Sequence, residues 1–242
     1  MSIVTTAASL VAFPVVAGII GGVVAVVRSP SPALVSGVQH FAAGVVMAAV
    51  AGEVLPDLRA RGSLWLIVVG FSAGVAVLVA LRHFGDEEDS GDNEDSGDAL
   101  PVAFLAVVAV DLFIDGLLVA TGATLSKRTA VIIAIALTVE VLFLGLTVAL
   151  RLAGSGVHRV RAAVTTGGVS LVTAVGAVLG ALVLGGASGN VRTLVLAFAA
   201  AALLWLVVEE LLVEAHETAE RPWMAVMFFA GFLILYCLGV ME

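Results

Sequence analysis

Residues 101–125 read PVAFLAVVAVDLFIDGLLVATGATL, and this stretch decides the fold. It is long enough to cross a bilayer as one helix, because a hydrocarbon core of about 30 Å needs about 20 apolar residues. Two acids, Asp111 and Asp115, interrupt the otherwise apolar run. The stretch therefore predicts a transmembrane helix that carries two carboxylates near its middle.

The rest of the chain repeats this apolar pattern. Of its 242 residues, 61% are hydrophobic and 12% are charged, whereas soluble domains are about 25% charged. The apolar runs are continuous, which favours helices over barrel strands, whose residues alternate in segments of about ten. We predict an all-α integral membrane protein, one domain over residues 1–242, with eight transmembrane helices at residues 3–27, 33–57, 63–82, 101–125, 129–151, 160–184, 191–215 and 222–241.

The formal charge of −8 arises from one acidic segment. Residues 86–98 hold eight acids, and without them the chain is neutral. Such a segment cannot bury apolar surface, so we predict a disordered loop over residues 84–99, between the third and fourth helices. The shortage of lysine beside many acids suggests a salt-loving (halophile) source. The absence of a basic patch argues against nucleic acid as a partner.

Acids within apolar runs are the most informative residues, because each costs roughly 2.5 to 3.5 kcal/mol at a helix centre. Asp111 and Asp115 share one helical face, and Glu140 lies near the middle of the next helix. A short connection makes these helices antiparallel neighbours, so the three carboxylates can converge. They cannot all stay ionised unless a cation joins them. We interpret them as an ion site. The alternatives are protonated, hydrogen-bonded carboxylates or a proton relay.

A second acidic pattern ends two other predicted helices. Glu53-Val-Leu-Pro-Asp57 ends the second, and Glu210-Leu-Leu-Val-Glu214 ends the seventh. These helices run in opposite directions, so the two strings fall near opposite membrane faces. An inverted repeat, helices 1–3 against helices 6–8 around a central pair, would produce this arrangement. We interpret the four acids as parts of an ion pathway. The alternative is that helix ends collect charges.

The same stretches resemble a known family. Asp111-Leu-Phe-Ile-Asp115-Gly116 resembles the fourth-helix signature of the ZIP (Zrt- and Irt-like) metal transporters, which reads His-Asn-x-x-Asp/Glu-Gly. The stretch from Glu140 to Gly145 falls where that family reads His-Glu-x-Pro-Glu/His-Gly. Residues 41–57 and 204–215 resemble its second and seventh helices. The resemblance covers most of the chain and keeps the order of the family's helices.

This resemblance implies transport of divalent metal cations, of the Zn, Mn, Fe or Cd class, by alternating movement of two helix groups. It also implies a multi-pass protein in the lipid of the cell membrane, with extracellular termini and a cytoplasmic acidic loop, and it suggests a homodimer. Apart from the metal as substrate, no cofactor is expected. The spans contain no Gly-x-Gly-Asp string, no Ser and His constellation and no phosphate loop, so we do not expect an enzyme.

The chain departs from the family pattern at several ligand positions. The His and Asn of the fourth helix are Asp111 and Leu112 here, and two ligands of the fifth helix are Val141 and Leu144. The resemblance therefore implies a single metal, bound by Asp111, Asp115 and Glu140.

Glu53 would be the gate or the fourth ligand of that metal. A set of carboxylates leans toward hard ions such as manganese, magnesium or calcium, because imidazole is what suits zinc. A non-transporting membrane sensor or structural protein is the alternative.

Overall fold

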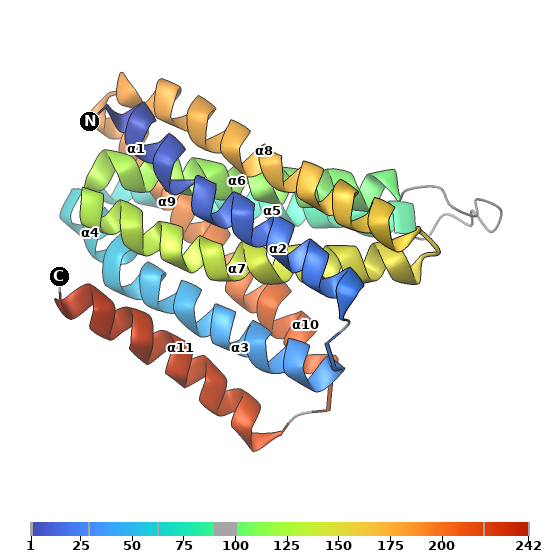
Figure 1. Cartoon of the computed structure of the whole chain (residues 1–242). Coiled ribbons are helices and arrows are strands. Elements are labelled where there is room, and N and C mark those ends of the chain that lie inside the picture. Colours follow the sequence, from blue (N-terminus) through green and yellow to red (C-terminus); the bar gives the residue numbers. More distant parts are fainter. Residues whose placement is uncertain (1, 29, 62, 90–100, 220, 242) are drawn as a thin grey trace.

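The computed structural model describes residues 2–28, 30–61, 63–89, 101–219 and 221–241. Within these ranges, eight helical spans are long and apolar enough to cross a membrane, as the sequence predicts. They form one bundle with both ends of the chain at the same end (Figure 1). We call this the terminal end. The opposite end, where α5 (Leu64–Asp89) stops and α6 (Val102–Leu125) starts, is the loop end.

The first span is divided into α1 (Ile3–Leu10) and α2 (Ala12–Val27). Pro14 explains the break, because it has no amide hydrogen to donate to the carbonyl of Leu10, four residues earlier. Both pieces continue in one direction as a single membrane crossing.

The second and seventh spans each contain a π-helical segment, which the apolar pattern of the sequence does not predict. The second consists of α3 (Pro32–Ala49), η1 (Val50–Val54) and α4 (Leu55–Arg61), and the seventh of α9 (Gly189–Trp205), η2 (Leu206–Leu211) and α10 (Leu212–His216). In η1 the cause is visible, because Pro56 cannot donate to the carbonyl of Gly52 and the amide of Leu55 bonds to Val50, five residues back. Segments of this kind occur frequently at functional sites.

The remaining spans are regular helices: α7 (Lys127–Gly154), α8 (Arg159–Gly185) and α11 (Pro222–Met241). α5 continues to Asp89, so the first residues of the predicted loop over 84–99 are helical rather than disordered. Extending an existing helix is easier than starting one, and glutamate is a good helix former. Residues 90–99 of that loop lie outside the described residues.

Close backbone contacts fix the helices around the centre. α2 packs against α7, and α6 packs against α8. A Cβ at Gly145 would lie 2.3 Å from the carbonyl oxygen of Gly18, and one at Gly116 would lie 2.1 Å from that of Thr173. Small residues permit such contacts where lipid supplies no hydrophobic drive. They hold α6 and α7, which carry the central acids, against their neighbours.

Apolar side chains cover both the interior and much of the outside. The main core joins α3, α7 and α9 through buried residues such as Val46, Leu137 and Leu203. Outward-facing side chains, such as Val183 on α8 and Phe229 on α11, are largely exposed. Such an apolar exterior fits a bundle whose solvent is lipid.

Candidate metal centre

The central acids are positioned by a one-residue connection between α6 and α7. Ser126 has an extended backbone and ends α6, and its hydroxyl oxygen accepts a 2.9 Å hydrogen bond from the amide of Thr129 in the first turn of α7. This side-chain cap satisfies one of the free amides at the start of a helix. The chain therefore reverses at once, and α6 and α7 run antiparallel with their middles at the same level.

The structure brings Asp111, Asp115 and Glu140 together, which confirms the predicted convergence. Each offers a carboxylate oxygen, and these oxygens lie within 4.8 Å of one another. Asp115 is 2% exposed and Glu140 is 1% exposed, while Asp111 is partly exposed. The three therefore form a compact and largely buried cluster. It is the one group of three such ligands found among the described residues.

Several oxygens of this cluster have no hydrogen-bond partner among the described residues. They are one oxygen each of Asp111 and Asp115 and both oxygens of Glu140. The carboxyl groups of Asp115 and Glu140 nevertheless lie close enough to interact with each other directly. An ionised carboxylate buried without a partner costs several kcal/mol, and three such groups also repel one another. A divalent cation bound among the oxygens would remove both costs. The orphaned oxygens thus fit a cation.

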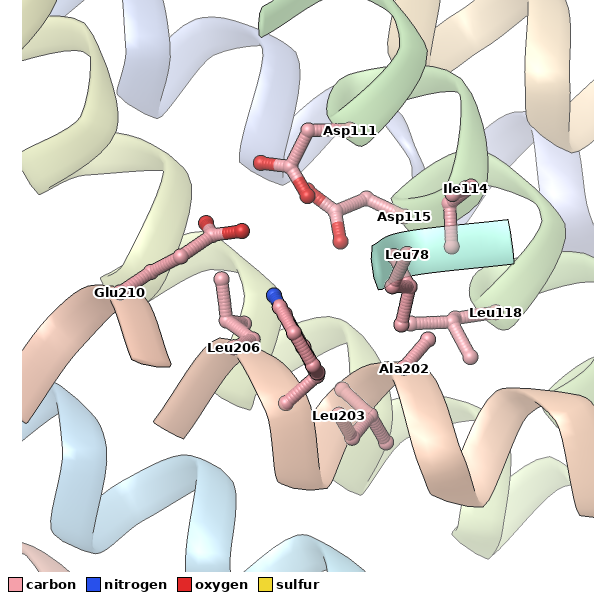
Figure 2. A pocket seen from close by; sticks show the side chains of 10 residues that line it. Leu78, Asp111, Ile114, Asp115, Leu118, Ala202, Leu203, Leu206 and Glu210 are labelled. Carbon is pink, nitrogen blue, oxygen red and sulfur yellow. The ribbon is translucent and has the colours of Figure 1, made fainter. Parts of the chain in front are cut away.

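A small cavity adjoins the two aspartates, and Glu210 lies on its other side (Figure 2). Its apolar walls include Leu78 of α5 and Leu206 of η2. In Figure 2 the carboxylate of Glu210 extends toward Asp111 and Asp115 across this cavity. Glu210 is close enough to interact electrostatically with both aspartates and with Glu140. The sequence predicts Glu210 in an ion pathway, and the structure places it beside the cluster itself.

The neighbouring Glu209 points elsewhere and has its own partner. Its carboxylate pairs with the guanidinium of Arg82 near the loop end of α5. Glu209 does not line the cavity. Two successive residues of a helix point in different directions, so the two glutamates have different surroundings. The sequence offered no signal for the Arg82–Glu209 pair.

The structure does not place Glu53 in the cluster, so Glu53 is not a fourth ligand in this conformation. The hydroxyl of Thr129 donates a 2.9 Å hydrogen bond to Glu53 Oε2, and Arg128 Nε lies 3.7 Å from Glu53 Oε1. A Cβ at Gly239 of α11 would be 3.7 Å from the same Oε1. Glu53 thus faces the first turn of α7 and α11, near the terminal end. α7 begins two residues before the predicted span, which brings Arg128 within reach.

The other two predicted pathway acids lie at opposite ends of the bundle. Asp57 forms an ion pair of 3.5 Å with Arg61, one turn later in α4, near the terminal end. Glu214 accepts a hydrogen bond from the side-chain amide (Nε2) of Gln39, near the loop end. Both acids are accessible, Glu214 more than Asp57. The expected separation of the two acidic strings is therefore present.

Comparison of the chain with models of known protein families gives no match, and comparison with curated proteins gives none either. The resemblance to ZIP transporters therefore stays a prediction from the residues.

Proposed function

We propose that this protein transports divalent metal cations across the cell membrane through a single mid-membrane carboxylate site. The observation that carries the proposal is the cluster of Asp111, Asp115 and Glu140, whose oxygens lie within 4.8 Å and largely lack partners. Ionisable groups in a membrane interior are costly and are typical of ion and proton paths. Carboxylate oxygens are the ligands that hard divalent cations prefer.

The distribution of the other acids supports a route through the bundle. Glu53 and Asp57 lie toward the terminal end, and Glu214 lies toward the loop end. The cluster lies between them, on the middle of α6 and α7. A cation could therefore meet carboxylates at its entrance, its midpoint and its exit, which lowers the cost of crossing an apolar bundle.

Helix packing supports an inverted repeat of spans 1–3 and 6–8 around spans 4 and 5. Exchanging span 1 with 6, 2 with 7, 3 with 8 and 4 with 5 turns one observed helix contact into another. The contact of α2 with α7 (spans 1 and 5) then corresponds to that of α8 with α6 (spans 6 and 4). The contact of α3 with α11 (spans 2 and 8) corresponds to that of α9 with α5 (spans 7 and 3). The two π segments, η1 and η2, also exchange. Such repeats are the usual basis of alternating access around a central site.

The ZIP-like resemblance supplies the remaining parts of this proposal. It favours extracellular termini, a cytoplasmic segment between α5 and α6, and assembly of two copies. The apolar residues Val141 and Leu144 stand where the family carries ligands on its fifth helix, which favours one bound metal over two. No enzymatic activity is proposed.

Transport is tested by reconstituting the purified protein into liposomes that enclose a metal-sensitive dye. We expect influx of Mn²⁺ down its gradient, a reduction of at least about tenfold in Asp115→Ala, and unchanged influx in the exposed control Glu217→Gln. Circular dichroism and a monodisperse elution profile would establish that each variant is folded. The same liposomes are then tested with Zn²⁺, Fe²⁺ and Cd²⁺.

The outcomes separate the proposal from its alternative. No influx of any metal into liposomes that hold folded wild-type protein would overturn transport. If Mn²⁺ nevertheless stabilised that protein against heat, a non-transporting metal sensor would replace the transporter. If Mn²⁺ had no effect on stability either, the cluster would be structural.

A further inference from the structure

Glu210 is the acid that the structure adds to the central cluster. Asp111, Asp115 and Glu210 line one cavity, and the carboxylate of Glu210 extends into it from the seventh span (Figure 2). The cluster opposite is built of side chains with unpartnered oxygens, of which Asp115 is 2% exposed and Glu140 is 1% exposed. Glu210 therefore faces a cluster whose unpartnered oxygens include one of Asp111 and one of Asp115.

The π-helical segment η2 determines which glutamate reaches the cavity. In η2 the amide of Leu212 bonds to the carbonyl of Val207, five residues back, so each turn holds an extra residue. Leu206 and Glu210 line the cavity, whereas Glu209 turns outward to Arg82. The Arg82–Glu209 pair fixes this orientation from the outside.

We propose that Glu210 is a fourth carboxylate ligand of the transported ion and that the site selects a hard, oxygen-preferring divalent cation such as Mn²⁺. This inference rests on the proposed function, because it concerns the same site. It replaces Glu53, which is held at the terminal end by Thr129 and Arg128. The four ligands would come from α6, α7 and η2, so ion binding would join the central pair of helices to the seventh span.

The ligand set accounts for the preferred class of ion. Four carboxylates offer up to eight oxygens and no nitrogen or sulfur. Hard cations such as Mn²⁺ and Mg²⁺ take about six oxygen ligands, while zinc sites usually contain histidine or cysteine.

Calorimetric titration of the purified full-length protein in detergent, with Mn²⁺ and separately with Zn²⁺, tests this inference. Glu210→Gln removes the charge and keeps the shape of the side chain, and we expect its Mn²⁺ affinity to fall at least about tenfold. The control is Glu217→Gln, an exposed glutamate just after the seventh span that does not line the cavity, whose Mn²⁺ affinity should stay within about twofold. Glu210→His supplies an imidazole and should raise the ratio of Zn²⁺ to Mn²⁺ affinity at least about tenfold.

The elution profile of each variant shows whether it is folded. If Glu210→Gln does not fold, Glu210→Asp replaces it as the test of the fourth ligand. Glu210→Asp keeps the charge but shortens the reach by one methylene, so we expect weaker Mn²⁺ binding from it as well. Wild-type Mn²⁺ affinity in Glu210→Gln, or in Glu210→Asp, would overturn the fourth ligand. If Glu210→His had the same ratio of Zn²⁺ to Mn²⁺ affinity as the wild type, the proposed preference for hard cations would be overturned.

Failure of this inference is distinguishable from failure of the proposed function. If Asp115→Asn abolishes Mn²⁺ binding while Glu210→Gln binds like the wild type, the three-carboxylate site stands and the fourth ligand falls. If the wild type itself binds neither metal, the proposed function and this inference fall together.

Discussion

The hydroxyl of Thr129 donates a 2.9 Å hydrogen bond to Glu53. This bond distinguishes the surroundings of Glu53 from those of Glu210, although both residues begin the same Glu-x-Leu-x-acid string. Both glutamates lie in π segments, η1 and η2. Glu53 is held at the first turn of α7, where the helix dipole favours a negative charge. Glu210 extends instead into the cavity beside Asp111 and Asp115. The same sequence pattern thus places one glutamate near the terminal end and the other at the central cavity.

Glu53→Gln should leave metal binding intact and lower stability slightly. The amide keeps an acceptor for Thr129 but loses the charge that Arg128 pairs with. We expect the free energy of unfolding to fall by about 1 kcal/mol, because Arg128 is half exposed and its ion pair is screened. Thermal unfolding in detergent and calorimetry with Mn²⁺ measure the two effects. A tenfold loss of Mn²⁺ affinity would return Glu53 to the ligand set.

Metal binding should stabilise the wild type and not Asp115→Asn. A ligand that binds only the folded state adds about 2.7 kcal/mol at a hundredfold excess over its Kd. The melting temperature of the wild type should therefore rise with added Mn²⁺, while that of the variant stays flat. The exposed control Glu217→Gln should rise like the wild type. An equal rise in Asp115→Asn would place the bound metal elsewhere.

Mn²⁺ affinity should fall as the pH is lowered, because protons and metal compete for the same carboxylate oxygens. Calorimetry between about pH 5 and pH 8 measures the trend. Titrations in two buffers with different ionisation enthalpies measure the protons released, and we expect net release. Affinity that rises toward acid pH would argue against carboxylate ligands.

The sequence alone predicts the eight apolar spans and the convergence of Asp111, Asp115 and Glu140. Apolar run length determines a membrane helix, and spacing by four residues puts Asp111 and Asp115 on one face whatever surrounds them. Glu140 joins them because the connection at Ser126 is too short for anything except an antiparallel pair. These inferences need only helix geometry and the thickness of a bilayer.

The surroundings of the glutamates in the second and seventh spans could not be predicted in the same way. A π segment inserts one residue and rotates the later part of the helix by about 100°. Pro56 is a local signal for η1, but η2 contains no proline. The position of each glutamate along its helix therefore does not predict that Glu53 pairs with Arg128 or that Glu210 lines the cavity. Partners from distant helices, such as Arg82 for Glu209, depend on packing alone.

Gly116→Ala should destabilise the bundle strongly. The added Cβ would lie 2.1 Å from the carbonyl oxygen of Thr173 and 2.5 Å from the amide nitrogen of Ala177, both backbone atoms. Overpacking of this kind costs about 1 to 3 kcal/mol or more. Gly168→Ala in α8 is the control, because its Cβ would meet nothing within 4 Å. The melting temperature of Gly168→Ala should be unchanged or higher. An equal fall of the melting temperature in both variants would contradict the close contact of α6 and α8.

The most direct test of the central claim is calorimetric titration of the purified wild type with Mn²⁺, Zn²⁺, Cd²⁺, Fe²⁺ and Mg²⁺, beside the triple variant Asp111→Asn, Asp115→Asn and Glu140→Gln. These substitutions keep side-chain shape and remove the charges of the cluster. We predict saturable binding by the wild type that disappears in the folded triple variant. Binding that persists unchanged in the triple variant, or no binding by the wild type, would contradict an ion site at these carboxylates.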